Sequence, residues 1–208
     1  MTDIKYQERI MEAARNKFFE QGFVKVTVDE IASDLGMSKK TLYKFFPSKE
    51  DLVRKVIHFM MRQANARIEA IVKSEKPFAE KLSELLSFIG RLWGRAGRQL
   101  PLDMKKYFPD LWKELEVFRR ERILVNMQKM FLQAKKEGEL RDDVDPQLLM
   151  LMFLVCVEGI LNPTTLAEQP FSLAEAFRGI FKILFVGAMT EEARQRHHIF
   201  EPTLSQNI

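Results

Sequence analysis

The chain has 208 residues, 46% of them hydrophobic and 30% charged, which is enough for the buried core of one or two small domains and argues against disorder. Its net charge of +4 permits a nucleic-acid partner without requiring one. A single cysteine excludes an internal disulfide, and the polar N-terminus and short apolar runs predict a cytoplasmic protein without signal peptide or membrane span.

Three helices are predicted within the first 47 residues, at 5–21, 28–35 and 39–45. Thr27 and Glu30 have the spacing of a capping box, which predicts the start of the second helix. Gly36 supplies the turn that follows, and Ser38 is placed to cap the third helix. This closely spaced pair of helices is typical of a helix-turn-helix reader of DNA.

Longer helices are predicted for the rest of the chain, at 48–73, 78–96, 110–136, 146–161 and 172–188, with a broken or briefly helical stretch at 97–109. No strand alternation interrupts them, and the polar tail after Thr190 has room for one short helix. The sequence therefore predicts an all-α fold. It is expected to comprise a helix-turn-helix domain at 1–47, a connecting helix at 48–73 and a larger helical domain at 74–208.

The 39–45 helix and its flanks carry four lysines and no acidic residue between positions 35 and 49. Lys39, Lys40 and Thr41 occupy its N-terminal end, which in a helix-turn-helix protein reaches the base edges. The other candidates for DNA contact are expected to meet the sugar-phosphate backbone or cap the helix. The full set is Thr27, Ser38, Lys39, Lys40, Thr41, Tyr43, Lys44 and Lys49.

Simpler interpretations of these residues remain open. The lysines could form a solvated face, Thr27 could only cap its helix, and Tyr43 could only pack. Leu42 and Phe46 are expected to pack beneath the helix.

The first 60 residues resemble the TetR family of bacterial transcription regulators. The similarity is carried by Ala13-Ala14, Phe19, Gly22-Phe23, Thr27-Val28, Glu30-Ile31-Ala32, Gly36, Ser38, Leu42-Tyr43, Phe46 and Lys49-Glu50-Asp51-Leu52. The resemblance implies three DNA-reading helices followed by an all-α ligand-binding and dimerisation domain. Phe45 departs from the histidine or tyrosine often found there, so it cannot donate to a phosphate, although an apolar contact with sugar or a thymine methyl stays open.

Two late helices, 146–161 and 172–188, are unusually apolar. Residues 148–157 are apolar nearly all round, which predicts burial on more than one side. The resemblance implies that these two helices of each subunit form a four-helix homodimer interface. The alternative is a monomer core.

Large, soft side chains are concentrated in the middle helices and could line an adaptable pocket. The candidates are Phe88, Trp93, Phe108, Trp112, Phe118, Met127, Met130 and Phe131. Ordinary core packing is the alternative for each of them. Few charges fall on these apolar faces, which favours a hydrophobic effector.

The expected function is therefore a dimeric transcriptional regulator, a repressor, that binds a palindromic double-stranded DNA operator through the 39–45 helix and is released by a small hydrophobic effector. The alternative is a dimeric DNA-binding regulator that has no small-molecule effector or is controlled by a protein partner.

An enzyme is not expected. His58, His197 and His198 lack the spacing of helical metal ligands, and no glycine-rich phosphate loop is found. Cys156 lies between two valines, which favours an inert buried thiol over a nucleophile. The sequence predicts neither a metal nor a cofactor.

Overall fold

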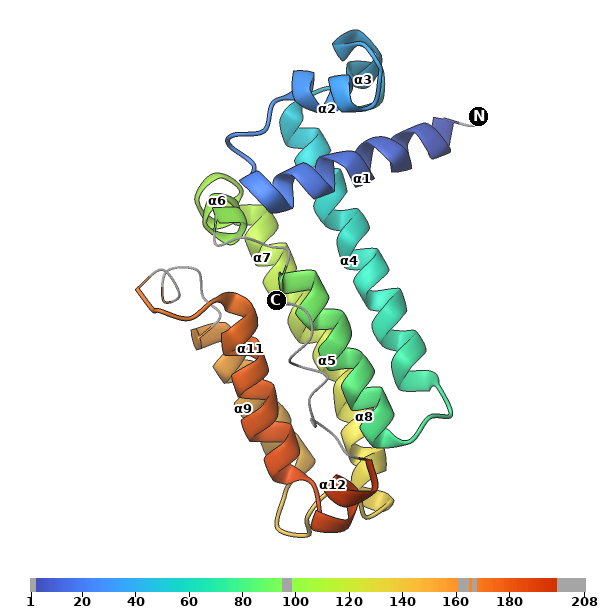
Figure 1. Cartoon of the computed structure of the whole chain (residues 1–208), viewed down its shortest axis with the longest axis vertical. Helices are drawn as coiled ribbons and strands as arrows, with labels where there is room; N and C mark the ends of the chain where they lie inside the picture. The colour runs from blue at the N-terminus through green and yellow to red at the C-terminus, as the bar shows by residue number, and fades with distance from the viewer. Residues whose placement is uncertain (1–2, 95–98, 161–164, 166–167, 198–208) are drawn as a thin grey trace. The chain divides into compact units, whose positions relative to one another are not determined.

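The structure, a computed structural model, describes residues 3–94, 99–160, 165 and 168–197 (Figure 1). The side chains of residues 92–94, 99, 196 and 197 lie outside that description. The elements are α1 (Asp3–Gln21), α2 (Val28–Asp34), α3 (Lys39–Phe45), α4 (Lys49–Lys73), α5 (Phe78–Gly94), α6 (Gln99–Tyr107), α7 (Pro109–Phe118), η1 (Arg119–Leu124), α8 (Val125–Lys136), α9 (Pro146–Ile160), α11 (Leu173–Phe181), η2 (Lys182–Val186) and α12 (Glu191–His197). The all-α prediction is confirmed, since the described residues contain no strand beyond an isolated bridge between Leu140 and Met189.

Glycines and capping residues set the ends of the first three helices. Gly22 and Gly36 adopt φ values of 82° and 64°, which L side chains rarely adopt, and so end α1 and separate α2 from α3. Thr27 and Glu30 form the complete capping box of α2. The Ser38 hydroxyl caps α3.

Two of the predicted long helices differ from the expectation. The helix expected at 110–136 contains a π-helical segment, η1, between α7 and α8, and the last long helix ends in a second one, η2. A π turn holds more residues than an α turn and so changes which side chains share a face. The stretch expected to be broken or briefly helical at 97–109 contains the short helix α6.

Contacts divide the chain into two compact units: Met1–Ala66 with Trp93–Phe118, and Arg67–Leu92 with Arg119–Ile208. The first unit thus includes α6 and α7, and helical periodicity alone did not indicate that these helices pack with the N-terminal ones. The functional boundaries expected at 47/48 and 73/74 remain predictions.

The first unit has a core that runs beneath α2 and α3. Its fully buried members include Ile10, Ala14, Phe18, Val26, Ile31, Leu42, Leu52, Val53, Val56 and Leu111. Asp103 of α6 is 2% exposed, and the Val24 backbone N–H donates to its Oδ2 at 3.3 Å. This bond holds the loop between α1 and α2 against α6.

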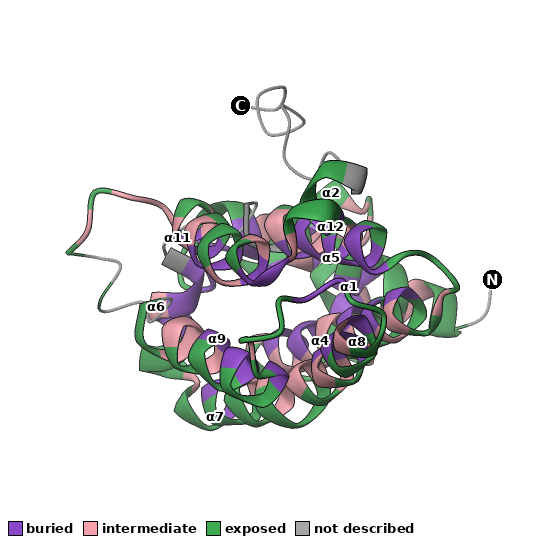
Figure 2. Cartoon of the chain, turned by 90° about the horizontal axis from the view of Figure 1, so that it is seen from below, coloured by how far each residue is buried: buried purple, intermediate pink, exposed green. Residues whose placement is uncertain are grey.

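The second unit has an aromatic core. The Phe131 ring centroid lies 5.1 Å from that of Phe78 and 4.7 Å from that of Phe185, and Phe185 in turn lies 4.9 Å from Phe153 and 4.6 Å from Phe181. These rings come from α5, α8, η2, α9 and α11. In each of these helices buried positions alternate with exposed ones (Figure 2).

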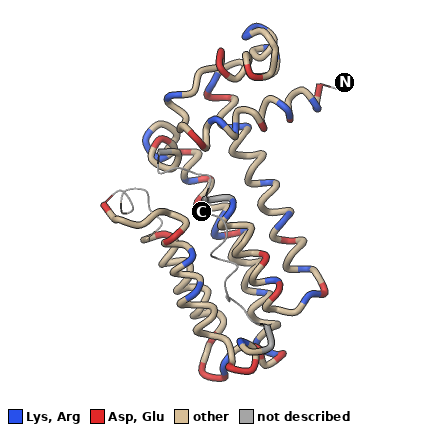
Figure 3. Tube along the Cα trace, viewed as in Figure 1, with Lys and Arg blue, Asp and Glu red and all other residues tan. Residues whose placement is uncertain are grey.

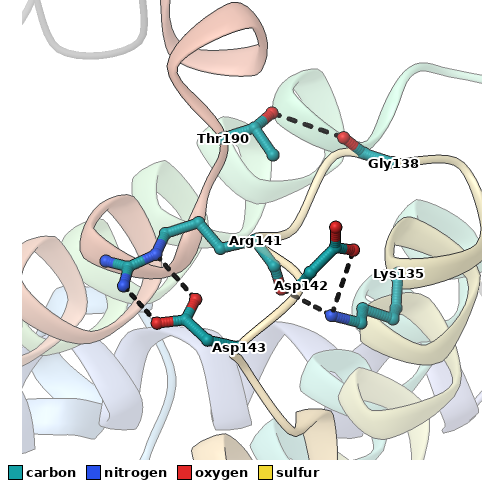
Figure 4. Close-up of polar contacts among 6 residues, drawn as sticks. All are labelled: Lys135, Gly138, Arg141, Asp142, Asp143 and Thr190. Carbon is teal, nitrogen blue, oxygen red and sulfur yellow. Dashed lines mark hydrogen bonds and ion pairs between the residues drawn. The ribbon is translucent and has the colours of Figure 1, made fainter.

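A polar cluster fixes the loop that leads from α8 to α9 (Figure 4). Lys135 Nζ donates to the Arg141 carbonyl at 2.5 Å, and Arg141 Nε donates to Asp143 Oδ1 at 2.9 Å. Thr190 Oγ1 donates to the Gly138 carbonyl at 3.3 Å. The bond from Thr190 ties the loop to the segment that precedes α12, and the other two fix the loop itself.

No helix in the described part of the chain is both long and apolar enough to cross a bilayer.

Candidate nucleic-acid interface

The first turn of α3 presents polar and basic side chains to solvent. Ser38, Lys39 and Lys40 are exposed and Thr41 is half-exposed, and the helix contains lysines without an acidic residue (Figure 3). The Thr41 N–H donates to Ser38 Oγ at 3.1 Å, and the two hydroxyl oxygens are 2.9 Å apart. The cap therefore fixes the turn that carries the predicted base-reading residues.

The opposite side of α3 is anchored in the core. Leu42 is fully buried and Phe46 is 1% exposed, as predicted for packing residues. The Lys55 ammonium lies 5.3 Å from the Phe46 ring centroid. Half-buried Phe45 stacks on Tyr6 of α1, with 6.0 Å between centroids and 15° between planes. This contact explains how a phenylalanine is accommodated there, and Tyr6 was not identified from the sequence.

Lys39 has an acidic partner that the sequence analysis missed. Its Nζ lies 2.7 Å from Asp29 Oδ2 on α2. The hydrogen bond from Lys39 to Asp29 raises the pKa of the Lys39 ammonium, so this group stays charged. Asp34, further along α2, pairs in the same way with Lys17 of α1 at 2.8 Å.

Thr27 is fully engaged in its cap. Its N–H and its hydroxyl both donate to Glu30 Oε2, at 2.7 and 2.9 Å, and its Oγ1 accepts from the Glu30 N–H at 3.2 Å. The hydrogen bonds that Glu30 Oε2 accepts, first from the Thr27 backbone N–H and then from its hydroxyl, lower the pKa of the Glu30 carboxyl. The geometry thus accounts for Thr27 as a cap, and its backbone contact with DNA stays a prediction.

The remaining basic candidates lie at the edges of the same surface. Tyr43 is 38% exposed and Lys44 is exposed. Lys49, the first residue of α4, donates from Nζ to the Val24 carbonyl at 3.3 Å. Lys49 therefore also has a structural role in holding the loop after α1.

The predicted pocket residues are divided between the two units. Trp112 belongs to the core of the first unit, and half-buried Phe108 packs against that core and contacts Phe23 at 5.7 Å between centroids. This placement supports ordinary core packing for these two. Phe118 is half-buried at the end of α7. The Trp93 side chain lies outside the described residues.

The other four pocket candidates lie in the second unit. Met127, Met130 and Phe131 are buried in α8, and Phe88 is half-buried in α5. Of the eight, these are the ones that share a compact unit with the apolar α9 and α11. Among the described residues, no three His, Cys, Asp or Glu side chains are grouped to hold a metal ion.

Comparison with known proteins finds a family model that is similar to the N-terminal helices. The model of the bacterial regulatory proteins of the tetR family matches residues 10–56, which span α1 to the first turns of α4.

Curated relatives extend the similarity over most of the chain. A regulator of Bacillus subtilis (strain 168) described as an uncharacterized HTH-type transcriptional regulator, YvaF, is 24% identical over 89% of this chain and 96% of its own. The nucleoid occlusion factor SlmA of Vibrio atlanticus (strain LGP32) is 26% identical over 86% and 93%. The fatty acid metabolism regulator protein of B. subtilis is 21% identical over 88% and 95%.

Solved structures share the fold. A transcriptional regulator from Cytophaga hutchinsonii aligns with a TM-score of 0.69 at 19% identity over 89% of this chain and 99% of that one. A TetR-family regulator from Mesorhizobium loti aligns with a TM-score of 0.62 at 22% identity over 91% and 100%.

Proposed function

We propose that the chain is a DNA-binding transcription regulator of the tetR family and that it acts as a homodimeric repressor. Its α3 binds a palindromic operator, and its second unit binds a small hydrophobic effector that releases the DNA. The observation that carries the proposal is the exposed basic first turn of α3, capped by Ser38 and seated on the buried Leu42 and Phe46.

The candidate DNA-contact residues are proposed to fall into two groups, one that contacts base edges and one that contacts the sugar-phosphate backbone. Lys39, Lys40 and Thr41 meet base edges, because a recognition helix enters the major groove by its N-terminal end. Tyr43, Lys44 and Lys49 meet phosphates, with Thr27 and Ser38 beside them. Each lysine that neutralises a phosphate releases counterions, so binding weakens as salt rises.

The homodimer is supported by an exposed apolar stripe on α9. Leu148, Leu151, Met152 and Val155 are between 46% and 60% exposed and recur at the spacing of one helix face. Leu149, Met150 and Phe153 on the other face are buried. An exposed apolar stripe of this length is typical of a protein–protein interface. Two copies joined there would present two α3 helices to a palindrome.

The effector is proposed to bind in the second unit, near Phe88, Met127, Met130 and Phe131. Soft apolar side chains accept ligands of varied shape. One relative is named as a regulator of fatty acid metabolism, which supports testing acyl chains first. The ligand would act by binding better to a dimer whose reading helices no longer match adjacent major grooves, and α4, which contributes to both compact units, is the proposed lever.

A second candidate is a dimeric DNA-binding factor without a small-molecule effector. The full burial of Met127 and Phe131 is consistent with a filled core, and one relative is named as a nucleoid occlusion factor. A thermal-shift screen against acyl and other lipophilic compounds separates the two. Stabilisation together with loss of DNA binding supports the repressor, and no shift across a broad set supports the second candidate.

Selection of bound sequences from random double-stranded DNA tests the proposal as a whole. We expect a palindrome whose half-sites are about one helical turn apart. Enrichment of no sequence, or of a sequence without symmetry, would overturn it. A protein that acts on DNA is also proposed to be cytoplasmic, which fractionation of cells tests directly.

A further inference from the structure

The ion pair between Lys39 and Asp29 joins the first turn of α3 to the first turn of α2. The two side chains are 51% and 63% exposed, so the paired groups face solvent at the surface proposed to meet DNA. An exposed ion pair of this kind contributes little to folding stability. The pair lies at the start of α3, where the proposed base-reading residues are.

The Lys39–Asp29 pair leaves a defined set of donors and acceptors able to bind a base pair. An ammonium has three N–H donors, and Asp29 Oδ2 takes one of those of Lys39. Two donors then remain beside a carboxylate that can accept. The surface thus presents donors and an acceptor side by side, at the 2.7 Å separation of the pair.

A G·C pair displays the complementary pattern in the major groove. Guanine offers the acceptors N7 and O6, and the paired cytosine offers the N4 amino donor next to O6. A T·A pair offers O4 and N6 in the same order, but it places the thymine methyl group where a second ammonium donor needs an acceptor. The reversed pairs, C·G and A·T, place an amino donor where the lysine ammonium also donates.

We propose that Asp29 is a specificity-determining residue and that Lys39 and Asp29 together select a G·C pair in each half-site. Lys39 donates to guanine O6 and N7, and Asp29 accepts from N4 of the paired cytosine while it holds the ammonium in place. This inference rests on the proposed function, since it requires α3 to read base edges.

The chain offers a matched control for Asp29. Asp34 lies on the same short helix, pairs with Lys17 at 2.8 Å, and is 54% exposed. Asp29→Ala and Asp34→Ala each remove one carboxylate from α2 and one partner from a lysine. They therefore change net charge equally, and a general gain in DNA affinity would appear in both.

The experiment selects bound sequences with the parent, Asp29→Ala, Asp34→Ala, Lys39→Ala and the double variant of Asp29 and Lys39. We expect Asp29→Ala to reduce the preference for G·C at one position of each half-site by about fivefold or more. Lys39→Ala should lose preference at the same position, and the double variant should lose little more than Lys39→Ala. Asp34→Ala should keep the parental preference at every position.

Two results would overturn the inference while the proposed function survives. One is an Asp29→Ala profile equal to that of Asp34→Ala, and the other is that Asp29 and Lys39 affect different positions. If the parent enriches no sequence, the proposed function falls and this inference with it. If circular dichroism shows that Asp29→Ala is unfolded, Asp29→Asn carries the test. It keeps an acceptor oxygen without the charge, so a partial loss at the same position is expected and an unchanged profile contradicts the inference.

Discussion

His58 Nε2 of α4 lies 2.7 Å from Glu114 Oε2 of α7, one helical turn along both helices from the ion pair of Arg54 Nη2 and Asp110 Oδ2 at 2.6 Å. The Arg54 guanidinium carbon also lies 5.9 Å from the ring centroid of Phe108. These contacts connect α7 to the part of α4 that directly follows α2 and α3. The first unit therefore includes residues more than 50 positions beyond the helix-turn-helix.

The Arg54–Asp110 pair gives the stability of the protein a defined dependence on pH. The hydrogen bond from Arg54 lowers the pKa of the Asp110 carboxyl below its ordinary value of 3.8. A lowered folded-state pKa contributes stability above the unfolded-state value, and this contribution is lost as pH falls through the folded-state value. Asp110→Asn should therefore lower Tm at pH 6 to 7. Its deficit should begin to shrink as pH falls below about 3.8 and should vanish only once the Asp110 carboxyl is protonated in the folded state as well.

The control for Asp110 is Asp142→Asn. Asp142 is fully exposed and lies 3.9 Å from Lys135, so its removal should leave the acid limb of the stability curve unchanged. The Tm of both variants is measured from pH 2 to 7 by thermal unfolding monitored with circular dichroism. An Asp110→Asn deficit that persists at the lowest pH would refute the assignment.

Substitutions of Leu42 and of its neighbour Tyr43 distinguish a residue needed for stability from one proposed to contact DNA. Leu42 is fully buried under α3, so Leu42→Ala should destabilise the protein by about 2–5 kcal/mol. Tyr43 is 38% exposed, so Tyr43→Ala should cost under about 1 kcal/mol and still weaken DNA binding. Urea denaturation and fluorescence anisotropy with operator DNA make the two measurements. Equal destabilisation by both substitutions would show that Tyr43 only packs.

Lys49→Ala should weaken binding to all sequences and reduce the slope of log affinity against log salt by about one, because one phosphate contact is lost. Lys49 also donates to the Val24 carbonyl, so the thermal stability of the Lys49→Ala variant must be measured as well. Lys25→Ala is the control, since Lys25 is an exposed lysine in the same loop that is not proposed to contact DNA. A parental salt slope in Lys49→Ala would remove Lys49 from the DNA-binding set.

Val155→Lys tests the proposed dimer face. Val155 is 60% exposed on the apolar stripe of α9, and a lysine buried there without a counter-charge should raise the dimer dissociation constant by at least about a hundredfold. Leu132→Lys is the matched control, because Leu132 is 41% exposed on α8 and lies off that stripe. Sedimentation velocity should find a monomer for the first variant and a dimer for the second. If both remain dimeric, the interface lies elsewhere.

The features that could be predicted from the sequence are those with local causes. Thr27, Ser38 and Ser172 start helices through bonds to residues three positions away, so their caps are visible in the chain itself. The pairing of Lys39 with Asp29 could not be predicted, because it depends on the angle between two helices. The packing of Asp103 beneath Val24, 79 positions away, likewise depends on tertiary structure.

The predicted pocket residues also show that tertiary packing could not be predicted from the sequence. Phe108 and Met127 are both large apolar residues, and composition does not distinguish them. The structure packs half-buried Phe108 against the core of the first unit and buries Met127 in the second unit. Apolar periodicity indicates that a side chain is buried, but it does not indicate which core receives it.

The most direct test of the regulator as a symmetric dimer is its affinity for the selected palindrome before and after about five base pairs are inserted between the half-sites. The insertion turns one half-site by half a helical turn, so two α3 helices fixed in one dimer can no longer enter both major grooves. We predict that the affinity falls to that of a single half-site or of non-specific DNA. An unchanged affinity would contradict recognition of DNA by a rigid, symmetric pair of α3 helices.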